Sequence, residues 1–240
     1  MKIWVDGREL DVERDVLLYD AMVSAGVEVP ALCRHGGLPH EGTCRVCMVE
    51  VDIRGKRRLV ASCMYPARDQ GLKVYTSTRR VEVARRFVIG LLLRRNPASP
   101  AIRALADRWG AMDTSRLSPV EGKDLCIRCG RCVRACATFG ARAISFANRG
   151  WDREVCTPLK EPTLICVGCL SCAEVCPTGH ITYRESQGER QIWGRTFHLV
   201  RCSRCGDPFA TREQLELVRD RGDVCPRCLR EEEGLALRDG

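Results

Sequence analysis

Residues 166–177 read Cys166-Val167-Gly168-Cys169-Leu170-Ser171-Cys172-Ala173-Glu174-Val175-Cys176-Pro177. The spacing C-x2-C-x2-C-x3-C followed by proline is typical of a ligand run for a cubane [4Fe–4S] cluster. The same cysteine spacing occurs upstream in Cys126-Ile127-Arg128-Cys129-Gly130-Arg131-Cys132-Val133-Arg134-Ala135-Cys136. Two copies in one chain predict a unit that binds two cubane clusters.

The two runs predict two mixed ligand sets, because in such units the fourth cysteine of each run binds the cluster of the other run. The predicted sets are Cys126, Cys129, Cys132 and Cys176 for one cubane, and Cys136, Cys166, Cys169 and Cys172 for the other. Gly130 and Gly168 fit the tight turns that these runs need. Ala137 stands where proline would be usual. The insert between the runs holds Cys156, which is either a small buried residue or a substitute ligand.

A third group of cysteines has the spacing C-x10-C-x2-C-x15-C. Its members are Cys33, Cys44, Cys47 and Cys63. A long loop, a tight turn and one distant position supply the ligands of [2Fe–2S] clusters in a related spread arrangement. Gly36, Gly37 and Gly42 suit a loop whose backbone wraps around a cluster and donates N–H groups to its sulfurs. The alternative is a set of ordinary buried thiols.

The last cysteines form two short knuckles near the C-terminus. They are Cys202, Cys205, Cys225 and Cys228. Two knuckles create a tetrahedral four-sulfur site that suits structural zinc, and a single rubredoxin-type iron is the alternative. We favour zinc, because the surrounding sequence lacks the aromatic residues of a rubredoxin core. The ion would fold a tail that is too small to fold alone.

The composition limits the class of protein. The 17 cysteines could build a secreted disulfide framework, but the N-terminus turns polar too early for a signal peptide, so a reducing cytoplasm fits better. The longest apolar run, residues 87–93, is too short to span a membrane.

The formal charge of +8 treats every cysteine as neutral. Four filled thiolate sites contribute about −8, which brings the loaded chain near neutrality.

Regular structure is expected between the cysteines. The residue pattern predicts strands at 2–5, 10–12, 45–51 and 58–61, with turns at Asp6-Gly7 and Gly55. Residues 16–25 read as a helix with Asp15 as its N-cap and Gly26 just past its end. Apolar residues at three- and four-residue steps predict a connecting helix and a second short one between residues 78 and 109.

The cysteine groups and the element pattern together predict an α+β chain with four parts. Residues 1–77 form a [2Fe–2S] β-grasp ferredoxin domain, 78–112 a helical connector, 113–186 a two-cluster [4Fe–4S] ferredoxin-like domain and 187–240 a zinc-ribbon-like tail. The charged, glycine-containing residues 184–190 read as the linker to the tail. No G-x-G-x-x-G or Walker A motif is present, so we predict no catalytic residue and expect an electron carrier.

The order of these sites resembles that of a known family. Besides the cysteine groups, the resemblance rests on Leu91-Leu92-Leu93 leading to Asn96-Pro97. The chain is similar to the short diaphorase iron–sulfur subunit of NAD-linked nickel–iron hydrogenases, to the N-terminal part of the large iron–sulfur subunit of complex I and to the N-terminal domains of iron-only hydrogenases. The resemblance covers about residues 1–186. In such relatives a further [4Fe–4S] is held by H-x3-C-x2-C-x5-C in the connector.

This connector pattern is not met here. Its ligand positions fall on Asn96, Pro100, Arg103 and Trp109, so we predict that the connector cluster is absent. The resemblance implies a hetero-oligomer in which the chain relays electrons between an FMN-containing NAD(P)H dehydrogenase-type subunit and a catalytic hydrogenase subunit. Formate dehydrogenase or a complex-I-like assembly is the alternative. Arg128, Arg131 and Arg134 are candidates for tuning the cluster potentials by charge.

Two other classes of protein compete with this relay. An iron–sulfur redox sensor or nucleic-acid-binding protein would use basic residues of the tail. Those residues are Arg201, Arg204, Arg227 and Arg230. The near-neutral loaded charge and the lack of an aromatic and basic face argue against nucleic acid. A self-sufficient hydrogenase fails because no cysteine or histidine constellation remains for a metal that binds substrate. We therefore expect an electron-transfer subunit without bound nucleic acid.

Overall fold

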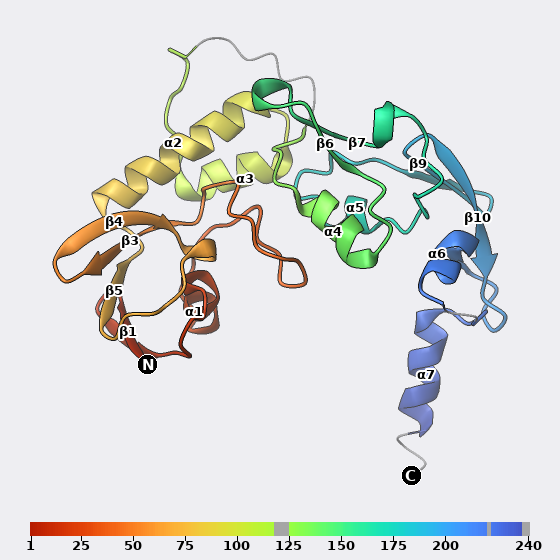
Figure 1. The fold of residues 1–240 in the computed structure, drawn as a ribbon, viewed down its shortest axis with the longest axis horizontal. Coiled ribbons are helices and arrows are strands. Elements are labelled where there is room, and N and C mark those ends of the chain that lie inside the picture. The colour runs from red at the N-terminus through yellow and green to blue at the C-terminus, as the bar shows by residue number, and fades with distance from the viewer. Residues whose placement is uncertain (118–124, 220–221, 237–240) are drawn as a thin grey trace. The chain divides into compact units, whose positions relative to one another are not determined.

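The computed structural model describes residues 1–117, 125–219 and 222–236 (Figure 1). Contacts divide the chain into two compact units, Met1–Arg131 and Cys132–Gly240. This division differs from the four predicted parts, which stay a prediction. Parts of the predicted 113–186 and 187–240 domains fall outside the described residues, at 118–124, 220–221 and 237–240.

The first unit begins with a five-stranded sheet in the order β2-β1-β5-β3-β4. Its strands are β1 (Lys2–Val5), β2 (Arg8–Asp11), β3 (Met48–Ile53), β4 (Lys56–Ala61) and β5 (Leu72–Tyr75). Strands β1 and β5 are parallel, whereas the other pairs are antiparallel. Asp6 and Gly7 both have positive φ, as a two-residue type I′ hairpin requires. The four predicted strands are confirmed, β1 with its predicted bounds and the other three with shifted ends.

One face of this sheet carries the core of the first unit. The side chains of β1 alternate between exposed and buried, so that Ile3 and Val5 point inward. They pack with Leu18 and Met22 of helix α1 (Leu18–Ser24), both fully buried. This alternation is what a strand produces in a sheet that has one face against the core and the other toward solvent. The core holds the loops of the first cysteine group in place.

Helix α1 starts two residues later than predicted, and Asp15 is not its cap. Leu17 occupies the N-cap position without a side-chain hydrogen bond. The backbone of Val16 accepts a hydrogen bond from Ala67, and Leu17 forms a β-bridge with Pro66. This pairing keeps the chain extended until Leu18, while Asp15 has positive φ and pairs with Arg68. Gly26 does end the helix, with φ of 77°.

Two helices follow the sheet, as predicted. Helix α2 (Arg79–Arg95) begins after Thr78, whose Oγ1 accepts a hydrogen bond from the N–H of Val81 at 3.3 Å. Helix α3 (Pro100–Trp109) packs against α2. A Cβ at Gly90 would lie 2.3 Å from the carbonyl oxygen of Met112, so this glycine allows the chain after α3 to lie directly on α2.

The second unit contains short elements around the cysteine runs. They are α4 (Arg131–Phe139), β6 (Ser145–Ala147), the 3-10 helix η2 (Gly150–Asp152), β7 (Glu154–Cys156), the 3-10 helix η3 (Pro158–Lys160) and α5 (Ser171–Glu174). Helix α4 carries Cys132 and Cys136 of the first run, and helix α5 carries Cys172 of the second. Strands β6 and β7 form a separate antiparallel hairpin in the insert between the runs.

A four-stranded antiparallel sheet completes the second unit, in the order β11-β10-β9-β8. Its strands are β8 (Arg184–Ser186), β9 (Glu189–Ile192), β10 (Arg195–Arg201) and β11 (Pro208–Thr211), followed by α6 (Arg212–Leu217) and α7 (Pro226–Ala236). The predicted linker at residues 184–190 was wrong, because these residues pair as β8 and β9 around a turn at Gln187 and Gly188. Within the described residues, no helix has the length and apolarity needed to cross a bilayer.

Candidate metal centres

The first unit brings the N-terminal cysteine group together. Cys33 comes from the loop after α1, Cys44 and Cys47 from the loop before β3, and Cys63 from the 3-10 helix η1 (Ser62–Met64) after β4. All four are buried. The Sγ atoms of Cys47 and Cys63 are 3.3 Å apart, and the N–H of Cys33 donates to Sγ of Cys44 at 3.4 Å. The group therefore offers four buried sulfurs and a backbone donor.

Backbone geometry shapes this site. Arg45, between Cys44 and Cys47, adopts the left-handed conformation with φ of 57°. The buried hydroxyl of Ser62 donates to the carbonyl of Cys47 at 2.8 Å and ties the two ligand segments together. Among the predicted loop glycines, Gly42 is constrained by both positive φ and space, since a Cβ there would lie 2.4 Å from Cγ of Met64. Gly36 and Gly37 meet no such limit.

Hydrogen bonds between the four thiols shift their pKa values in opposite directions. Hydrogen bonds from the thiols of Cys44 and Cys63 lower the pKa of Cys33, and the Cys63 thiol lowers the pKa of Cys47 to about 6. Donating those hydrogen bonds, together with burial, raises the pKa values of Cys44 and Cys63. Such a set provides thiolates for a cationic iron centre once the protons in these hydrogen bonds leave. The chemistry of the donors fits a [2Fe–2S] cluster.

Helices α2 and α3 cover this site on one side. Ile89 of α2 and Ile102 of α3 are fully buried in the same cluster of side chains as Cys33 and Cys44. Arg85, also buried, donates through Nη2 to the carbonyls of Met48 and Thr76 at 3.0 Å each, and it stacks on the ring of Trp109. Burial among apolar side chains limits solvent access, which tunes a bound cluster.

The two C-x2-C-x2-C runs share one backbone pattern. The residues flanking the middle cysteine have positive φ in both runs: Arg128 (55°) and Gly130 (71°), and Gly168 (65°) and Leu170 (63°). Each run places its glycine where another segment approaches. A Cβ at Gly130 would lie 2.4 Å from the carboxylate of Glu41, and one at Gly168 would lie 2.8 Å from Phe197. The predicted tight turns at Gly130 and Gly168 are confirmed.

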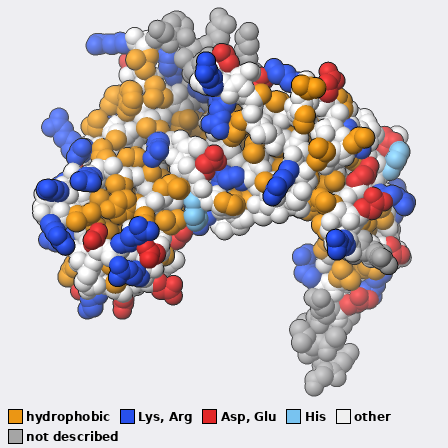
Figure 2. All heavy atoms as spheres, viewed as in Figure 1, with side chains coloured by type: hydrophobic (Ala, Val, Ile, Leu, Met, Phe, Trp, Pro, Cys, Tyr) orange, Lys and Arg blue, Asp and Glu red, His pale blue; other side chains and the backbone are white. Residues whose placement is uncertain are grey.

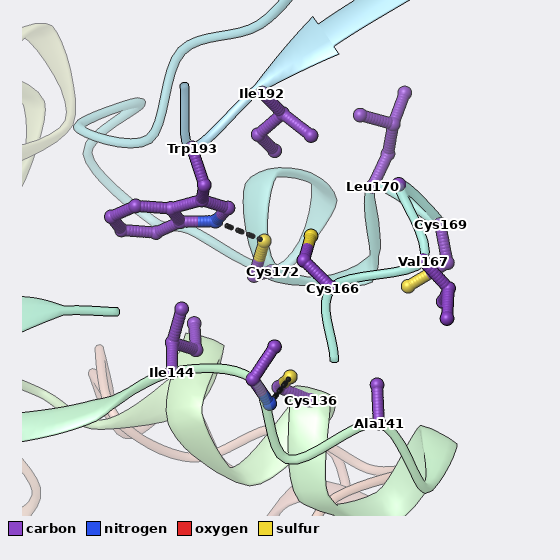
Figure 3. A pocket seen from close by; sticks show the side chains of 12 residues that line it. Cys136, Ala141, Ile144, Cys166, Val167, Cys169, Leu170, Cys172, Ile192 and Trp193 are labelled. Atoms are coloured by element: carbon purple, nitrogen blue, oxygen red, sulfur yellow. Dashed lines mark hydrogen bonds between the residues drawn. The ribbon is translucent and has the colours of Figure 1, made fainter. Parts of the chain in front are cut away.

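Four cysteines from both runs line one apolar pocket of the second unit, and they are Cys136, Cys166, Cys169 and Cys172 (Figure 3). Ala141, Ala143, Ile144 and Ile192 contribute to its walls. The N–H of Ala143 donates to Sγ of Cys136 at 3.1 Å. The donor set and the apolar lining fit a cubane cluster. The predicted second ligand set is therefore brought together in space.

Trp193 was missed as a site residue by the sequence reasoning. Its indole Nε1–H donates to Sγ of Cys172 at 3.5 Å at the edge of the same pocket (Figure 3). Burial raises the pKa of Cys172 to about 11, and the hydrogen bond from Trp193 acts in the opposite direction. No local pattern indicates a cysteine as the partner of Trp193, and Trp-Gly is not among the residue pairs that predict a two-residue hairpin turn.

Strands β9 to β11 hold the loop that carries Cys166 and Cys169. Arg195 Nη1 donates to the carbonyls of Thr163, Leu164 and Cys166. The buried side chain of Arg190 donates through Nη1 to the carbonyl of Gly168 at 2.7 Å. Thr211 donates its hydroxyl to the carbonyl of Val167. Side-chain donors from three strands thus satisfy the carbonyls of this ligand loop.

The other predicted cubane set is divided between the two units. Cys126 and Cys129 belong to the first unit, and Cys132 and Cys176 belong to the second, so this set stays a prediction. In the first unit, the N–H of Arg128 donates to Sγ of Cys126 at 3.3 Å. In the second unit, burial raises the pKa of Cys176, but N–H groups that follow it outweigh that effect and lower the pKa.

The C-terminal group forms a compact four-sulfur site. All four Sγ atoms of Cys202, Cys205, Cys225 and Cys228 lie within 4.8 Å of one another. Cys202 and Cys205 lie in the turn between β10 and β11, where the N–H of Cys202 bonds to the carbonyl of Asp207. N–H groups of Cys205 and Cys225 lower the pKa of Cys202 to about 6, whereas burial raises that of Cys228 to about 12. Four sulfurs at this spacing fit a tetrahedral metal ion.

The connector positions have structural contacts instead of ligands. Asn96 ends α2 and is buried, Pro100 is the first residue of α3, and Trp109 stacks with Arg85. Arg103 Nε donates to the carbonyl of Pro97. These side chains are therefore used in joining the two helices.

Cys156 lies apart from the four-cysteine pocket. It belongs to β7 and is half-buried, and it lines a different pocket with Thr157, Pro158 and Leu159. Its two sequence-based interpretations, a plain packing residue and a substitute ligand, stay open.

The chain matches two families of iron–sulfur domains. Residues 1–79 match a 2Fe-2S iron-sulfur cluster binding domain, and residues 165–211 match a 4Fe-4S dicluster domain. The second match covers the run from Cys166 to Cys176 and continues through β11. The run from Cys126 to Cys136 lies outside both matches. A recognised domain therefore covers the predicted [2Fe–2S] group and the second of the two predicted [4Fe–4S] runs.

Curated relatives belong to oxidoreductases. The chain is 29% identical to the NADH-ubiquinone oxidoreductase 75 kDa subunit of Reclinomonas americana, over 80% of this chain and 31% of the relative. It is 31% identical to NADP-reducing hydrogenase subunit HndD of Solidesulfovibrio fructosivorans, over 77% of this chain and 36% of the relative. The chain thus spans about a third of the length of these relatives.

A solved structure supports the same relationship. The chain is similar to a chain in the crystal structure of an NAD+-reducing [NiFe]-hydrogenase in the H2-reduced state, with a TM-score of 0.57 and 27% identity. The match covers 65% of this chain and 74% of that one. The chain is therefore an iron–sulfur protein related to the 75 kDa subunit of NADH-ubiquinone oxidoreductase and to subunits of NAD(P)-linked hydrogenases, with a 2Fe-2S and a 4Fe-4S domain.

Proposed function

We propose that the chain is an electron-transfer subunit of a cytoplasmic, multi-subunit NAD(P)-linked oxidoreductase. It relays electrons between an FMN-containing NAD(P)H dehydrogenase-type subunit and a catalytic subunit, for which a hydrogenase is our first choice. The observation that carries the proposal is the pocket lined by four cysteines from two separate runs, together with the hydrogenase and NADH oxidoreductase relatives. Formate dehydrogenase or a complex-I-like module is the alternative partner.

We assign one [2Fe–2S] and two [4Fe–4S] clusters to the chain. The [2Fe–2S] is assigned to Cys33, Cys44, Cys47 and Cys63, one cubane to Cys136, Cys166, Cys169 and Cys172, and the other to Cys126, Cys129, Cys132 and Cys176. Bound clusters of these types accept and donate single electrons. The cysteines would hold the iron, and the backbone N–H groups of Cys33 and Ala143 would stabilise negative charge on sulfur.

We assign a structural zinc ion to the four-sulfur site of the tail. Its buried side-chain cluster consists of Cys202, Cys225 and Cys228, with Phe209 and Val224 packed against them. In this site, the proposed ligands are also the buried side chains that pack the module. Such a site suits a redox-inert metal ion with four protein ligands, whose binding contributes to the free energy of folding. A rubredoxin-type iron in the same four sulfurs is the alternative.

A nucleic-acid-binding role has little support from the arginines of the tail. Arg201 donates to the carbonyl of Gly206, Arg204 bonds to the carbonyl of Cys228 and pairs with Glu232, and Arg227 pairs with Asp207. On the face drawn in Figure 2, basic side chains are interspersed with acidic ones. Proteins that bind phosphate backbones gather their basic residues on one face.

Metal analysis and EPR spectroscopy of the anaerobically purified chain test the proposal. We expect about ten irons and about one zinc per chain, with both [2Fe–2S] and [4Fe–4S] signals after reduction. Cys172→Ser should remove one [4Fe–4S] signal. Cys156→Ser should keep all signals where Cys156 is a packing residue and should perturb one where it is a substitute ligand. Four zinc ions with negligible iron and acid-labile sulfide would refute the electron-transfer role.

The choice of partner needs a separate experiment. The native complex should be captured through a tag on this chain, and its other subunits identified by mass spectrometry. An FMN-containing subunit together with a hydrogenase subunit is the expected result. Salt-dependent binding of the purified chain to DNA that disappears in Arg201→Ala/Arg204→Ala would favour the competing class instead.

A further inference from the structure

The turn that carries Trp193 has an unusual residue at its first position. Ile192 of β9 pairs with Arg195 of β10, so Trp193 and Gly194 form a two-residue hairpin turn. Their φ values of 52° and 73° are both positive. Turns of this kind favour asparagine, aspartate or glycine at the first position, because other side chains are strained there. A tryptophan at this position needs a compensating contact.

The pocket of the four cysteines supplies that contact. The indole of Trp193 is half-buried, and its Nε1–H donates to Sγ of Cys172 (Figure 3). Ile192 is buried in the wall of the same pocket. Trp193 and Ile192 also line a second, open pocket with Tyr183 and Arg184. The indole thus forms part of the wall between the cysteine pocket and the protein surface.

We infer that Trp193 raises the reduction potential of the cluster that Cys136, Cys166, Cys169 and Cys172 would hold. The inference rests on the proposed function. One added electron increases the negative charge on the thiolate sulfurs, and an N–H donor aimed at Cys172 stabilises that charge more in the reduced state than in the oxidised state. Hydrogen bonds to sulfur are one of the quantities that set cluster potentials.

Among the described residues around the pocket, Trp193 is the side chain whose N–H donates to a ligand sulfur, whereas the hydroxyl of Ser171 accepts a hydrogen bond from Sγ of Cys169 at 3.4 Å. The N–H of Ala143 is a backbone group that any residue except proline would supply. The nearby arginines Arg190 and Arg195 direct Nη1 at backbone carbonyls of the ligand loop. Trp193 is a positioning residue in this scheme, because it acts on the redox group through Cys172 and takes part in no bond change.

The test is an EPR-monitored redox titration of the full, cluster-loaded chain. Trp193→Phe removes the N–H and keeps an aromatic ring in the wall. We expect the midpoint potential of one [4Fe–4S] signal to become more negative, while the potentials of the other two clusters stay unchanged. Trp4→Phe is the matched control, because Trp4 is an exposed residue of β1 in the other unit. It should shift none of the three potentials.

A second measurement separates the electronic role from packing. In D2O, the reduced wild-type cluster should show hyperfine coupling to an exchangeable deuteron that is missing in Trp193→Phe. If Trp193→Phe fails to keep its cluster, replacing Trp193 with the isosteric benzothienylalanine, which has sulfur in place of the N–H, provides the same comparison with the shape preserved.

The outcomes are distinct. An unchanged potential in a variant that retains its cluster overturns the role of Trp193, as does an equal shift of all three potentials. A lower melting temperature with unchanged potential shows that the residue only packs. Absence of any [4Fe–4S] signal in the wild-type chain refutes the proposed function itself.

Discussion

The N-terminal domain and the C-terminal tail each gather four cysteines, but they do so by different means. Residues 1–79 have a continuous core of buried side chains from the sheet and α1, and of the four proposed ligands Cys47 and Cys63 belong to it. Around the C-terminal cysteines, three of the four proposed ligands are themselves the buried cluster. A domain with its own core presents the ligands, whereas a small module without one depends on the metal ion for its folding.

The strongest test of this contrast removes one ligand from each region. In Cys228→Ser, we expect the tail to lose its proposed ion and residues 202–219 and 222–236 to lose protection from hydrogen exchange, because structural zinc sites contribute on the order of 10 kcal/mol to folding. In Cys63→Ser, the [2Fe–2S] site should be lost while β1, β3 and β5 stay protected. Hydrogen exchange followed by mass spectrometry measures both. Equal loss of protection in the two regions would show that the tail does not depend on its ion more than the N-terminal domain does.

The core of the N-terminal domain can be weakened without touching a ligand. Leu72 of β5 is 2% exposed, and Leu72→Ala should lower the free energy of unfolding of this domain by about 2–5 kcal/mol through the cavity it leaves. Val23→Ala, at an exposed position of α1, is the control and should change it by less than about 0.5 kcal/mol. Denaturant titration followed by hydrogen exchange reports the difference. If both variants changed the free energy of unfolding by a similar amount, burial of Leu72 would not be a main source of this domain's stability.

The ligand loop of the second unit is intermediate between these two regions, because side chains of β9, β10 and β11 hold it. Gly168→Ala combines a strained φ of 65° with a clash against Phe197. Gly179→Ala has the same φ but open space around its Cβ. We expect Gly179→Ala to cost about 1–2 kcal/mol and Gly168→Ala to cost clearly more and to reduce cluster retention. Iron content and melting temperature measure the pair, and equal effects would show that the contact with Phe197 is adaptable.

The smallest expected effect concerns Thr211, which links the tail to that loop. Its hydroxyl donates to the carbonyl of Val167 and accepts a hydrogen bond from the N–H of Gln214 as the N-cap of α6. Thr211→Ala should lower stability by about 0.5–2 kcal/mol, because it removes the cap. Thr211→Ser keeps the hydroxyl and should lose much less. Faster hydrogen exchange around Val167 in the alanine variant alone is the diagnostic result.

The parts of the fold that could be predicted are those specified by residues close together in the sequence. The turn at Asp6-Gly7, the end of α1 at Gly26 and the two helices after Thr78 follow from turn chemistry, capping and periodicity, and the structure has them. The start of α1 could not be predicted, because the backbone pairing of Leu17 with Pro66 holds those residues extended. Likewise, residues 184–190 are too polar to indicate strands, and they become strands because β8 pairs with β9 and β9 pairs with β10.

The order of the amino acids by itself predicts which cysteines act as ligands, because C-x2-C spacing brings sulfurs close together within a single turn of chain. What surrounds those sulfurs depends on folding in three dimensions. Cys136 reaches the pocket of Cys166 only through the folding of the insert, and Trp193 meets Cys172 only because a hairpin turn lies over that pocket. Ligand spacing is local geometry, whereas hydrogen bonds to sulfur depend on segments that are distant in the chain.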